Sequence, residues 1–193
     1  AKTLLVRSLA AALDVRMRRV QFTPDMMPGD ITGSLVYDNS TSDLGFREGP
    51  VFTNLLLADE INRTPPKTQS ALLEAMEERQ VSVDGTTYAL AEPFMVVATA
   101  NPVEMEGSYR LPEAQRDRFM ARIAMGYPSV DAERQMLANR GGSDPLSRLR
   151  PIVDVTTLRA IIETVAGVHI APDVEAYIIA IVRSTRTHPD LVL

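Results

Sequence analysis

The chain has 193 residues, enough for one α/β domain and a small additional unit, and it contains no cysteine, which excludes disulfide bonds and thiolate metal sites. Its formal net charge of −5 argues against a dedicated nucleic-acid-binding protein, because such proteins usually carry a basic face. No apolar run approaches the roughly 18 residues that a membrane-spanning helix requires, so we expect no membrane span.

The first fifty or so residues predict a helix, a short strand and a polar excursion. A helix from near Thr3 is indicated by apolar residues at helical spacing, namely Leu5, Leu9, Ala12 and Leu13. Apolar and polar residues alternate over 19–22, which predicts a strand, and the pair Pro28-Gly29 then interrupts regular structure. Residues 33–49 are polar and rich in turn-forming residues, so we expect a small hairpin or excursion there rather than a core element.

The middle of the chain predicts two strands that are buried in a parallel sheet. Residues 54–60 form a short continuous apolar run that ends in two carboxylates, and residues 94–99 form a second such run. Between them, Pro65-Pro66 opens a predicted helix that continues through Arg79. The pair Asp84-Gly85 lies between alternating residues and predicts a hairpin.

The last part of the chain predicts mainly helices. Residues 112–119 predict a short helix, and residues 122–126 predict a further strand. Two later helices are indicated by apolar stripes, which consist of Val155, Leu158, Ile161, Ile162 and Val165 in one and of Val174, Tyr177, Ile178, Ile181 and Val182 in the other. The predicted fold is therefore α/β, with a sheet domain over residues 1–126 and a small all-helical lid over residues 127–193.

The strongest chemical feature is the pair Asp59-Glu60, directly after the first buried run. Ligands bind at the strand tips of an open parallel sheet. Asp59 is suited there to hold Mg²⁺, and Glu60 is suited to polarise an attacking water in nucleotide hydrolysis. The alternative is that two acidic residues simply end a strand in solvent, and this pair alone does not decide between the two interpretations.

Other positions fit the same chemistry by their place in the chain. Lys2 and Thr3 stand directly before the first predicted helix, where Lys2 would contact the β- and γ-phosphates and Thr3 would bind Mg²⁺. Asn101 follows the second buried run and is either the group that orients the attacking water or a turn residue before Pro102. Arg118 is either a surface residue or a source of positive charge for a phosphoryl group on a neighbouring subunit.

Taken together and in this order, these features resemble the MoxR family of AAA+ ATPases. The matching text includes GPVF at 49–52, LLLADEINRTPPKTQSALLEAMEERQVSVDG at 55–85, PFMVVATANPVEMEGSYRLPEAQRDRF at 93–119 and TRTHPDL at 185–191. The resemblance implies an αβα nucleotide-binding domain with a helical lid. It also implies that residues 33–49 are a family hairpin insert and that the hairpin at Asp84-Gly85 is the one before sensor 1.

The resemblance further assigns a role to each candidate residue. Lys2 and Thr3 match the end of Walker A, Asp59 and Glu60 match Walker B, Asn101 matches sensor 1, and Arg118 matches the arginine finger. The glycine-rich half of Walker A would precede Ala1, and the sensor 2 arginine would follow Leu193. We therefore expect the sequence to be part of a longer protein and this piece alone to be inactive.

The function that the resemblance implies is ATP- and Mg²⁺-dependent, chaperone-like remodelling of partner proteins by a ring, typically a hexamer, with a von Willebrand factor A domain partner and a cytoplasmic location. The alternatives are a motor subunit of a metal-chelatase-like complex and a binding module that needs no nucleotide. DNA translocation is disfavoured, because residues 81–92 contain no Lys or Arg and the charged residues within 33–49 are acidic except for Arg47. The client protein cannot be named from the sequence.

Overall fold

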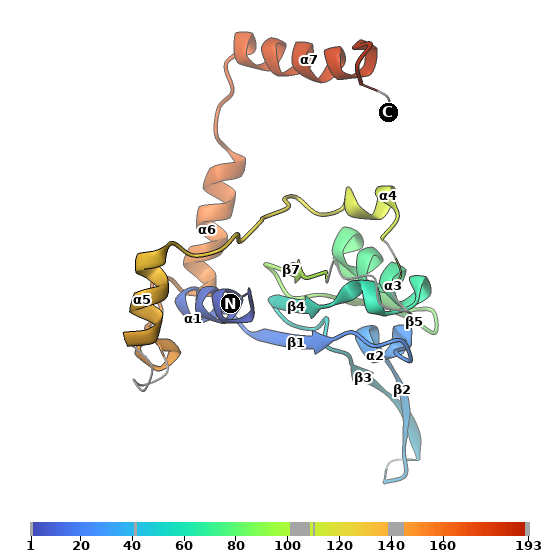
Figure 1. Ribbon diagram of the computed structural model, residues 1–193. Coiled ribbons are helices and arrows are strands. Elements are labelled where there is room, and N and C mark those ends of the chain that lie inside the picture. Colours follow the sequence, from blue (N-terminus) through green and yellow to red (C-terminus); the bar gives the residue numbers. More distant parts are fainter. Residues whose placement is uncertain (1, 41, 101–108, 110, 139–144, 192–193) are drawn as a thin grey trace. The chain divides into compact units, whose positions relative to one another are not determined.

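The computed structural model describes residues 2–40, 42–100, 109, 111–138 and 145–191. Its internal contacts divide the chain into two units, residues 1–155 and 156–193. The elements that precede and include the central sheet are α1 (Lys2–Ala12), β1 (Met17–Gln21), α2 (Pro28–Thr32), β2 (Gly33–Asp38), β3 (Asp43–Glu48), β4 (Leu55–Asp59), the 3₁₀ turn η1 (Ile61–Arg63), α3 (Pro66–Glu78), β5 (Gln80–Val83), β6 (Thr86–Ala89) and β7 (Met95–Ala98) (Figure 1).

The centre of the first unit is a three-stranded parallel sheet in the order β1-β4-β7. β4 is its middle strand, and it is buried on both faces: Leu56 and Ala58 face one apolar cluster, whereas Leu55 and Leu57 face another. Each buried leucine contributes roughly 1.5–3 kcal/mol to stability. The predicted run at 54–60 is thus confirmed as a strand buried in a parallel sheet.

The flanking strand β7 differs from its prediction in burial. Its residues are half-buried or exposed, with Met95 exposed to 41%, because β7 pairs with β4 along one edge only within the described part of the chain. The position of the strand within the predicted run 94–99 is correct. The expected burial is therefore partial: Val96 and Ala98 pack against one apolar cluster and Val97 against the other, and Phe94 and Thr99 at the ends of the run are buried.

Helix α1 covers one face of the sheet. Its start near Thr3 was predicted correctly, but its buried residues are Val6 and Ala10, which pack against the β4 leucines. Leu5 and Leu9 are exposed to 55% and 38%. The predicted apolar stripe is therefore offset by one residue from the face that the helix buries. The buried face consists of Val6 and Ala10, which pack against Leu55 and Leu57 of β4.

Helix α3 covers the other face, where Leu72 and Ala75 join the main core cluster. Pro66 occupies the first turn, where the missing N–H costs no hydrogen bond, and the helix ends at Arg79 in a left-handed conformation. With α1 on one face and α3 on the other, the unit has the predicted αβα layering (Figure 1).

Helix α2 was not predicted, because Pro28-Gly29 indicated only an interruption. Pro28 instead begins the helix, and the carboxylate of Asp30 accepts a 2.8 Å hydrogen bond from the Met27 N–H. Ile31 at its centre is fully buried in the main core. A proline followed by an acidic residue two positions later can therefore start a helix as readily as end one.

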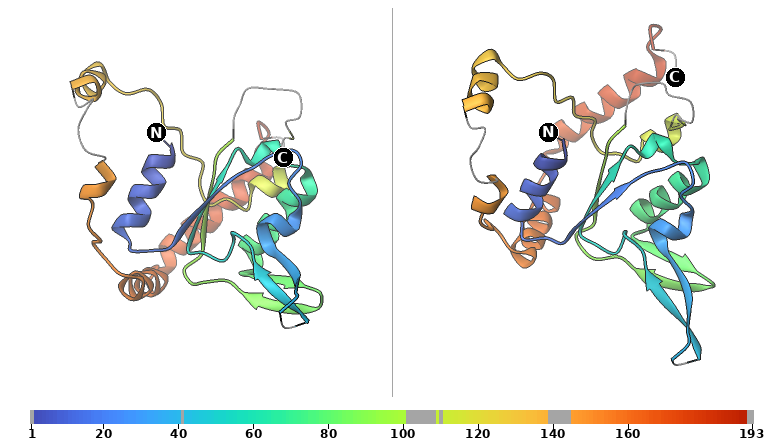
Figure 2. Two further views of the ribbon diagram at one scale, coloured as in Figure 1. Left: turned by 90° about the horizontal axis from the view of Figure 1, so that it is seen from below. Right: turned by 60° about the horizontal axis from the view of Figure 1, so that its bottom comes forward.

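Two antiparallel hairpins confirm the predictions at 33–49 and at Asp84-Gly85. β2 pairs with β3, and β5 pairs with β6 through a turn in which Asp84 and Gly85 have φ angles of 49° and 77°. Phe46 stacks on Tyr88 with ring centroids 3.9 Å apart, which joins the two hairpins. Figure 2 shows the β2–β3 hairpin extending away from the sheet.

The remaining elements are α4 (Glu113–Arg116), α5 (Val130–Ala138), the 3₁₀ turn η2 (Pro145–Arg148), α6 (Val155–Ala166) and α7 (Pro172–Thr187). The helix predicted at 112–119 is confirmed as the shorter α4. The strand predicted at 122–126 is wrong: this segment is irregular and exposed, because no neighbouring strand among the described residues pairs with its backbone groups.

The second unit consists of helices, as predicted. α6 and α7 contain both predicted apolar stripes, and Asp173 and Glu175 lie in the first turn of α7, where the helix dipole favours negative charge. The boundary predicted at residue 127 stays a prediction. Within the described part of the chain, none of the helices has the length and apolar character that crossing a bilayer demands.

Candidate active site

The candidate site lies where the parallel strands end. Asp59 is the last residue of β4, and Glu60 follows it in a left-handed conformation, with φ 57° and ψ 48°. This conformation is unusual for a residue other than glycine and is typical of functional turns. The Glu60 N–H donates to the Thr99 hydroxyl at 2.9 Å, so the chain that follows β7 fixes the turn.

The Asp59 carboxylate is held by donors from both neighbouring strands. On one side, Arg19 of β1 donates to Oδ2 from Nε at 3.1 Å and from Nη2 at 2.7 Å. On the other side, the Thr99 hydroxyl donates to Oδ1. Parallel pairing explains this arrangement, because it places Gln21 beside Asp59 and Ala98 beside Ala58, so the three strands end at one edge.

These contacts set the charge of Asp59. Partial burial acts to raise the pKa of its carboxyl group, but the hydrogen bonds from Thr99 and Arg19 and the charges of Arg19 and Lys2 together outweigh burial. The pKa of Asp59 therefore lies below its ordinary value. The group is ionised at neutral pH, as a metal ligand must be.

The Glu60 carboxylate is oriented separately from Asp59. One oxygen, Oε2, accepts hydrogen bonds from Gln21 Nε2 at 2.9 Å and from Arg63 Nη1 at 3.0 Å. Gln21 also accepts from Arg19 through its Oε1 at 2.9 Å, so one side chain of β1 connects the surroundings of the two carboxylates. The buried Gln69 side chain donates to the Ile61 and Thr64 carbonyls and thereby supports the turn that carries Arg63.

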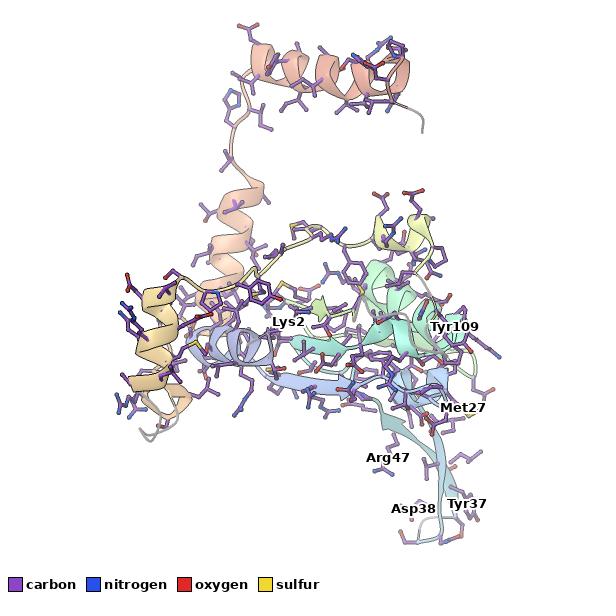
Figure 3. All side chains as sticks on the ribbon, in the orientation of Figure 1. Lys2, Met27, Tyr37, Asp38, Arg47 and Tyr109 are labelled. Carbon is purple, nitrogen blue, oxygen red and sulfur yellow. The ribbon has the colours of Figure 1, made fainter. Side chains whose placement is uncertain are left out.

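Lys2 and Thr3 were predicted to stand directly before the first helix, and the structure places both in the first turn of α1. Lys2 lies close enough to Asp59 for its charge to lower the pKa of that group, and Figure 3 shows it between α1 and the strands. The first N–H groups of a helix have no partner within the helix and suit phosphate oxygens. The charge of Lys2 thus links the start of α1 to Asp59 at the end of β4, with Thr3 next to Lys2 and Glu60 next to Asp59 in the chain.

These residues fit Mg²⁺ bound together with a nucleotide. Asp59 is an ionised oxygen ligand, and the Thr3 hydroxyl stands at the start of α1. Among the described residues, no group of three or more His, Asp or Glu side chains could hold a metal by itself. The two oxygen ligands, Asp59 and Thr3, match Mg²⁺, which usually takes one or two protein ligands and completes its shell with water and substrate phosphates.

The remaining two predicted site residues are Asn101 and Arg118. Asn101 lies outside the described residues. Arg118 forms an ion pair with Glu77 at 2.9 Å, at the far end of α3 from Glu60. The pair lies in an open groove of about 510 Å³ whose lining includes Glu74, Glu78 and Gln115. Glu77 comes 11 positions after Pro66 in α3, so this end is about 16 Å along the helix from its start.

Sequence reasoning missed Arg19, Gln21 and Thr99, and it assigned no role to Arg63. Arg19 and Gln21 were noted only as the polar residues of an alternating strand. What could have identified them is the strand register. Both are polar residues of a strand that pairs in parallel with the strand that carries Asp59. That register involves residues about 40 positions apart and becomes visible only in the folded chain.

Known proteins share this sequence and fold. The model of the "ATPase family associated with various cellular activities (AAA)" matches residues 1–121. The chain is 48% identical over 192 residues to the uncharacterised protein YeaC of Bacillus subtilis, covering 100% of this chain and 60% of YeaC. It is 44% identical over 186 residues to the chaperone MoxR1 of Mycobacterium tuberculosis, covering 96% of this chain and 49% of MoxR1.

A crystal structure of a protein from Cytophaga hutchinsonii, assigned there as an ATPase, has a TM-score of 0.86 and 43% identity, covering 96% of this chain and 56% of that one. The fold, the site and the family match define the class as AAA ATPases. Within this class, the chain belongs to the MoxR family. It spans 49% to 60% of the length of these three proteins.

Proposed function

We propose that this chain is the catalytic part of an ATP-hydrolysing motor that remodels partner proteins. The observation that carries the proposal is the site at the end of β4, where Asp59 is ionised beside the charge of Lys2 and Glu60 is held separately by Gln21 and Arg63. Two adjacent carboxylates with different partners suit two different tasks, metal binding and activation of water.

Each residue has a distinct task in this proposal. Lys2 and the first N–H groups of α1 bind the phosphates of ATP, and Thr3 and Asp59 supply oxygen ligands for Mg²⁺. Bound Mg²⁺ supplies neutralising charge to the phosphate oxygens. Glu60 orients the attacking water and accepts its proton, and Asn101 assists in orienting that water.

Arg118 acts on the site of a neighbouring subunit. In its own subunit the guanidinium pairs with Glu77, at the far end of α3 from Glu60. A residue held there is better placed to complete a site across a subunit boundary than the site of its own chain. This supports a ring, with a hexamer as the expected size, in which each active site is shared by two subunits.

The work of the motor is chaperone-like, and we propose a von Willebrand factor A domain protein as a partner. The relative MoxR1 is named as a chaperone. Hydrolysis would be coupled to movement of a helical lid, residues 127–193, relative to the sheet domain of residues 1–126. The location that goes with this activity is the cytoplasm.

A DNA-translocating motor is disfavoured by the charge of the two hairpins. The β2–β3 hairpin has Arg47 against the acidic residues Asp38, Asp43 and Glu48, and the β5–β6 hairpin carries Asp84. Phosphate backbones are gripped by lysine and arginine, so this surface would repel nucleic acid.

The proposal is tested with two variants of the full-length protein that each lose one half of the shared site. Glu60→Gln removes the group that activates water, and Arg118→Ala removes the group that acts in the neighbouring subunit. Each variant alone is expected to lose ATP hydrolysis, and a mixture of the two is expected to recover part of it, because some mixed sites contain both intact residues. If both variants assemble into mixed rings and the mixture stays inactive, the shared site is refuted.

A further inference from the structure

The guanidinium of Arg19 occupies one oxygen of Asp59, Oδ2, that a metal ion could otherwise bind. Its Nε and Nη2 both donate to Oδ2, at 3.1 and 2.7 Å, and the Thr99 hydroxyl donates to Oδ1. A carboxylate oxygen offers two lone pairs. Arg19 engages both lone pairs of Oδ2, and Thr99 engages one lone pair of Oδ1. One lone pair, on Oδ1, is left for a metal ion or for a water molecule bound to it.

Charge opposes a metal ion at this position as well. The Asp59 carboxylate already lies against the guanidinium of Arg19, and the Lys2 charge also acts on it. A divalent cation that approaches Oδ2 is repelled by the guanidinium unless the two charges exchange places. Arg19 and Mg²⁺ therefore compete for the charge and the oxygen lone pairs of the Asp59 carboxylate.

Arg19 is also free enough to leave Asp59. Its side chain is 49% exposed, whereas that of Asp59 is 16% exposed, so the arginine can turn towards solvent while the carboxylate stays in place. Gln21 offers it a second acceptor, because Arg19 Nη2 already donates to Gln21 Oε1 at 2.9 Å. An ion pair with a solvent-exposed guanidinium contributes little to stability, so a bound metal ion can displace it.

We propose that Arg19 is a positioning residue that competes with Mg²⁺ for Asp59, so that Mg²⁺ gains full access to the carboxylate as the guanidinium leaves Oδ2. In the metal-free protein Arg19 holds the ionised Asp59 side chain in place and balances its negative charge. The site is fully assembled only when Mg²⁺ and nucleotide bind together. This inference depends on the proposed nucleotide-binding function of the same site.

The experiment measures binding of a fluorescent methylanthraniloyl derivative of ATP to the full-length protein over a range of Mg²⁺ concentrations. Arg19→Gln removes the competing charge. The Mg²⁺ concentration that gives half-maximal binding is expected to fall about two- to fivefold, the range that corresponds to an exposed ion pair. Arg19→Lys keeps the charge but cannot place two donors on one oxygen, and it should lower the value by a smaller factor.

Arg16→Gln is the matched control. Arg16 is exposed just before β1, at the opposite end of the strand from the site, and its loss changes the net charge by the same amount. An unchanged or higher Mg²⁺ requirement in Arg19→Gln, or an equal decrease in Arg16→Gln, overturns the competition. If the wild-type protein binds no nucleotide at any Mg²⁺ concentration, the proposed function itself fails.

Discussion

Replacing Thr99 by valine removes the hydroxyl that links the ends of β4 and β7 while keeping the shape of the side chain. Thr99 is 9% exposed, and its hydroxyl donates to Asp59 and accepts the Glu60 N–H. A hydrogen bond to a charged group contributes about 1.5–3 kcal/mol. The Glu60 N–H lies in a half-buried turn that water can reach, so we assign it little additional cost.

We therefore expect Thr99→Val to lower the free energy of unfolding by about 2 kcal/mol at pH 7. Urea unfolding followed by circular dichroism measures this difference, and the slope against urea should stay unchanged. Thr99→Ser keeps the hydroxyl and is the control, with a smaller expected loss. A change below about 0.5 kcal/mol in Thr99→Val, or an equal loss in Thr99→Ser, would refute the role of the hydroxyl.

The effect of Thr99→Val should depend on pH in a defined direction. Because the pKa of Asp59 is lowered in the folded protein, its ionised form adds stability above the unfolded value of about 3.9, and this is lost as pH falls through the folded value. The difference between wild type and Thr99→Val should therefore be full at neutral pH and shrink below about pH 4. A difference that grows in acid would contradict the assigned contact.

Three further substitutions test the fold and the site. Leu56→Ala, at a fully buried position in β4, should cost about 2–5 kcal/mol of unfolding free energy by urea denaturation. Gly49→Ala should cost about 1–3 kcal/mol, because the added Cβ would collide with the backbone of Ile31 and Gly33 at the base of the β2–β3 hairpin; Gly45→Ala, in open space, is the control. Arg118→Ala should change stability by less than about 1 kcal/mol, since its pair with Glu77 is exposed, but lower the ATP hydrolysis rate by about 10³-fold or more. Equal losses of stability at Gly49 and Gly45, or full activity of Arg118→Ala, would contradict these assignments.

The elements predicted best were those whose sequence pattern follows from local geometry or from burial on all sides. The run ending at Asp59 was recognised because a middle strand of a parallel sheet is apolar at successive positions. The Asp84-Gly85 turn was recognised because few residue pairs accept positive φ at both positions.

The elements that were missed depend on partners elsewhere in the chain. The segment 122–126 has the composition of a strand but no strand beside it among the described residues. Which face of α1 is buried depends on the leucines of β4, so Val6 and Ala10 are buried in place of Leu5 and Leu9. These features follow from packing and not from local periodicity.

The position of Asp59 and Glu60 at the end of a strand was predicted from the sequence, but the residues that hydrogen-bond to them were not. Asp59 and Glu60 follow a recognisable strand, so their position was clear from the sequence. Arg19 and Thr99 reach Asp59 only because β1, β4 and β7 end at the same edge of the sheet. A search for polar residues directly after the predicted parallel strands would have found Thr99, whereas Arg19 lies in the middle of β1 and reaches Asp59 only through its long side chain.

The central claim, that Glu60 activates water for hydrolysis while other residues hold ATP, is tested most directly by Glu60→Gln in the full-length protein. The rate of phosphate release and the affinity for ATP are measured side by side, with Glu48→Gln in the exposed β2–β3 hairpin as the control. Our account predicts a fall in rate of about 10²- to 10⁴-fold with ATP affinity retained, and no change in the control. Undiminished hydrolysis by Glu60→Gln would contradict it.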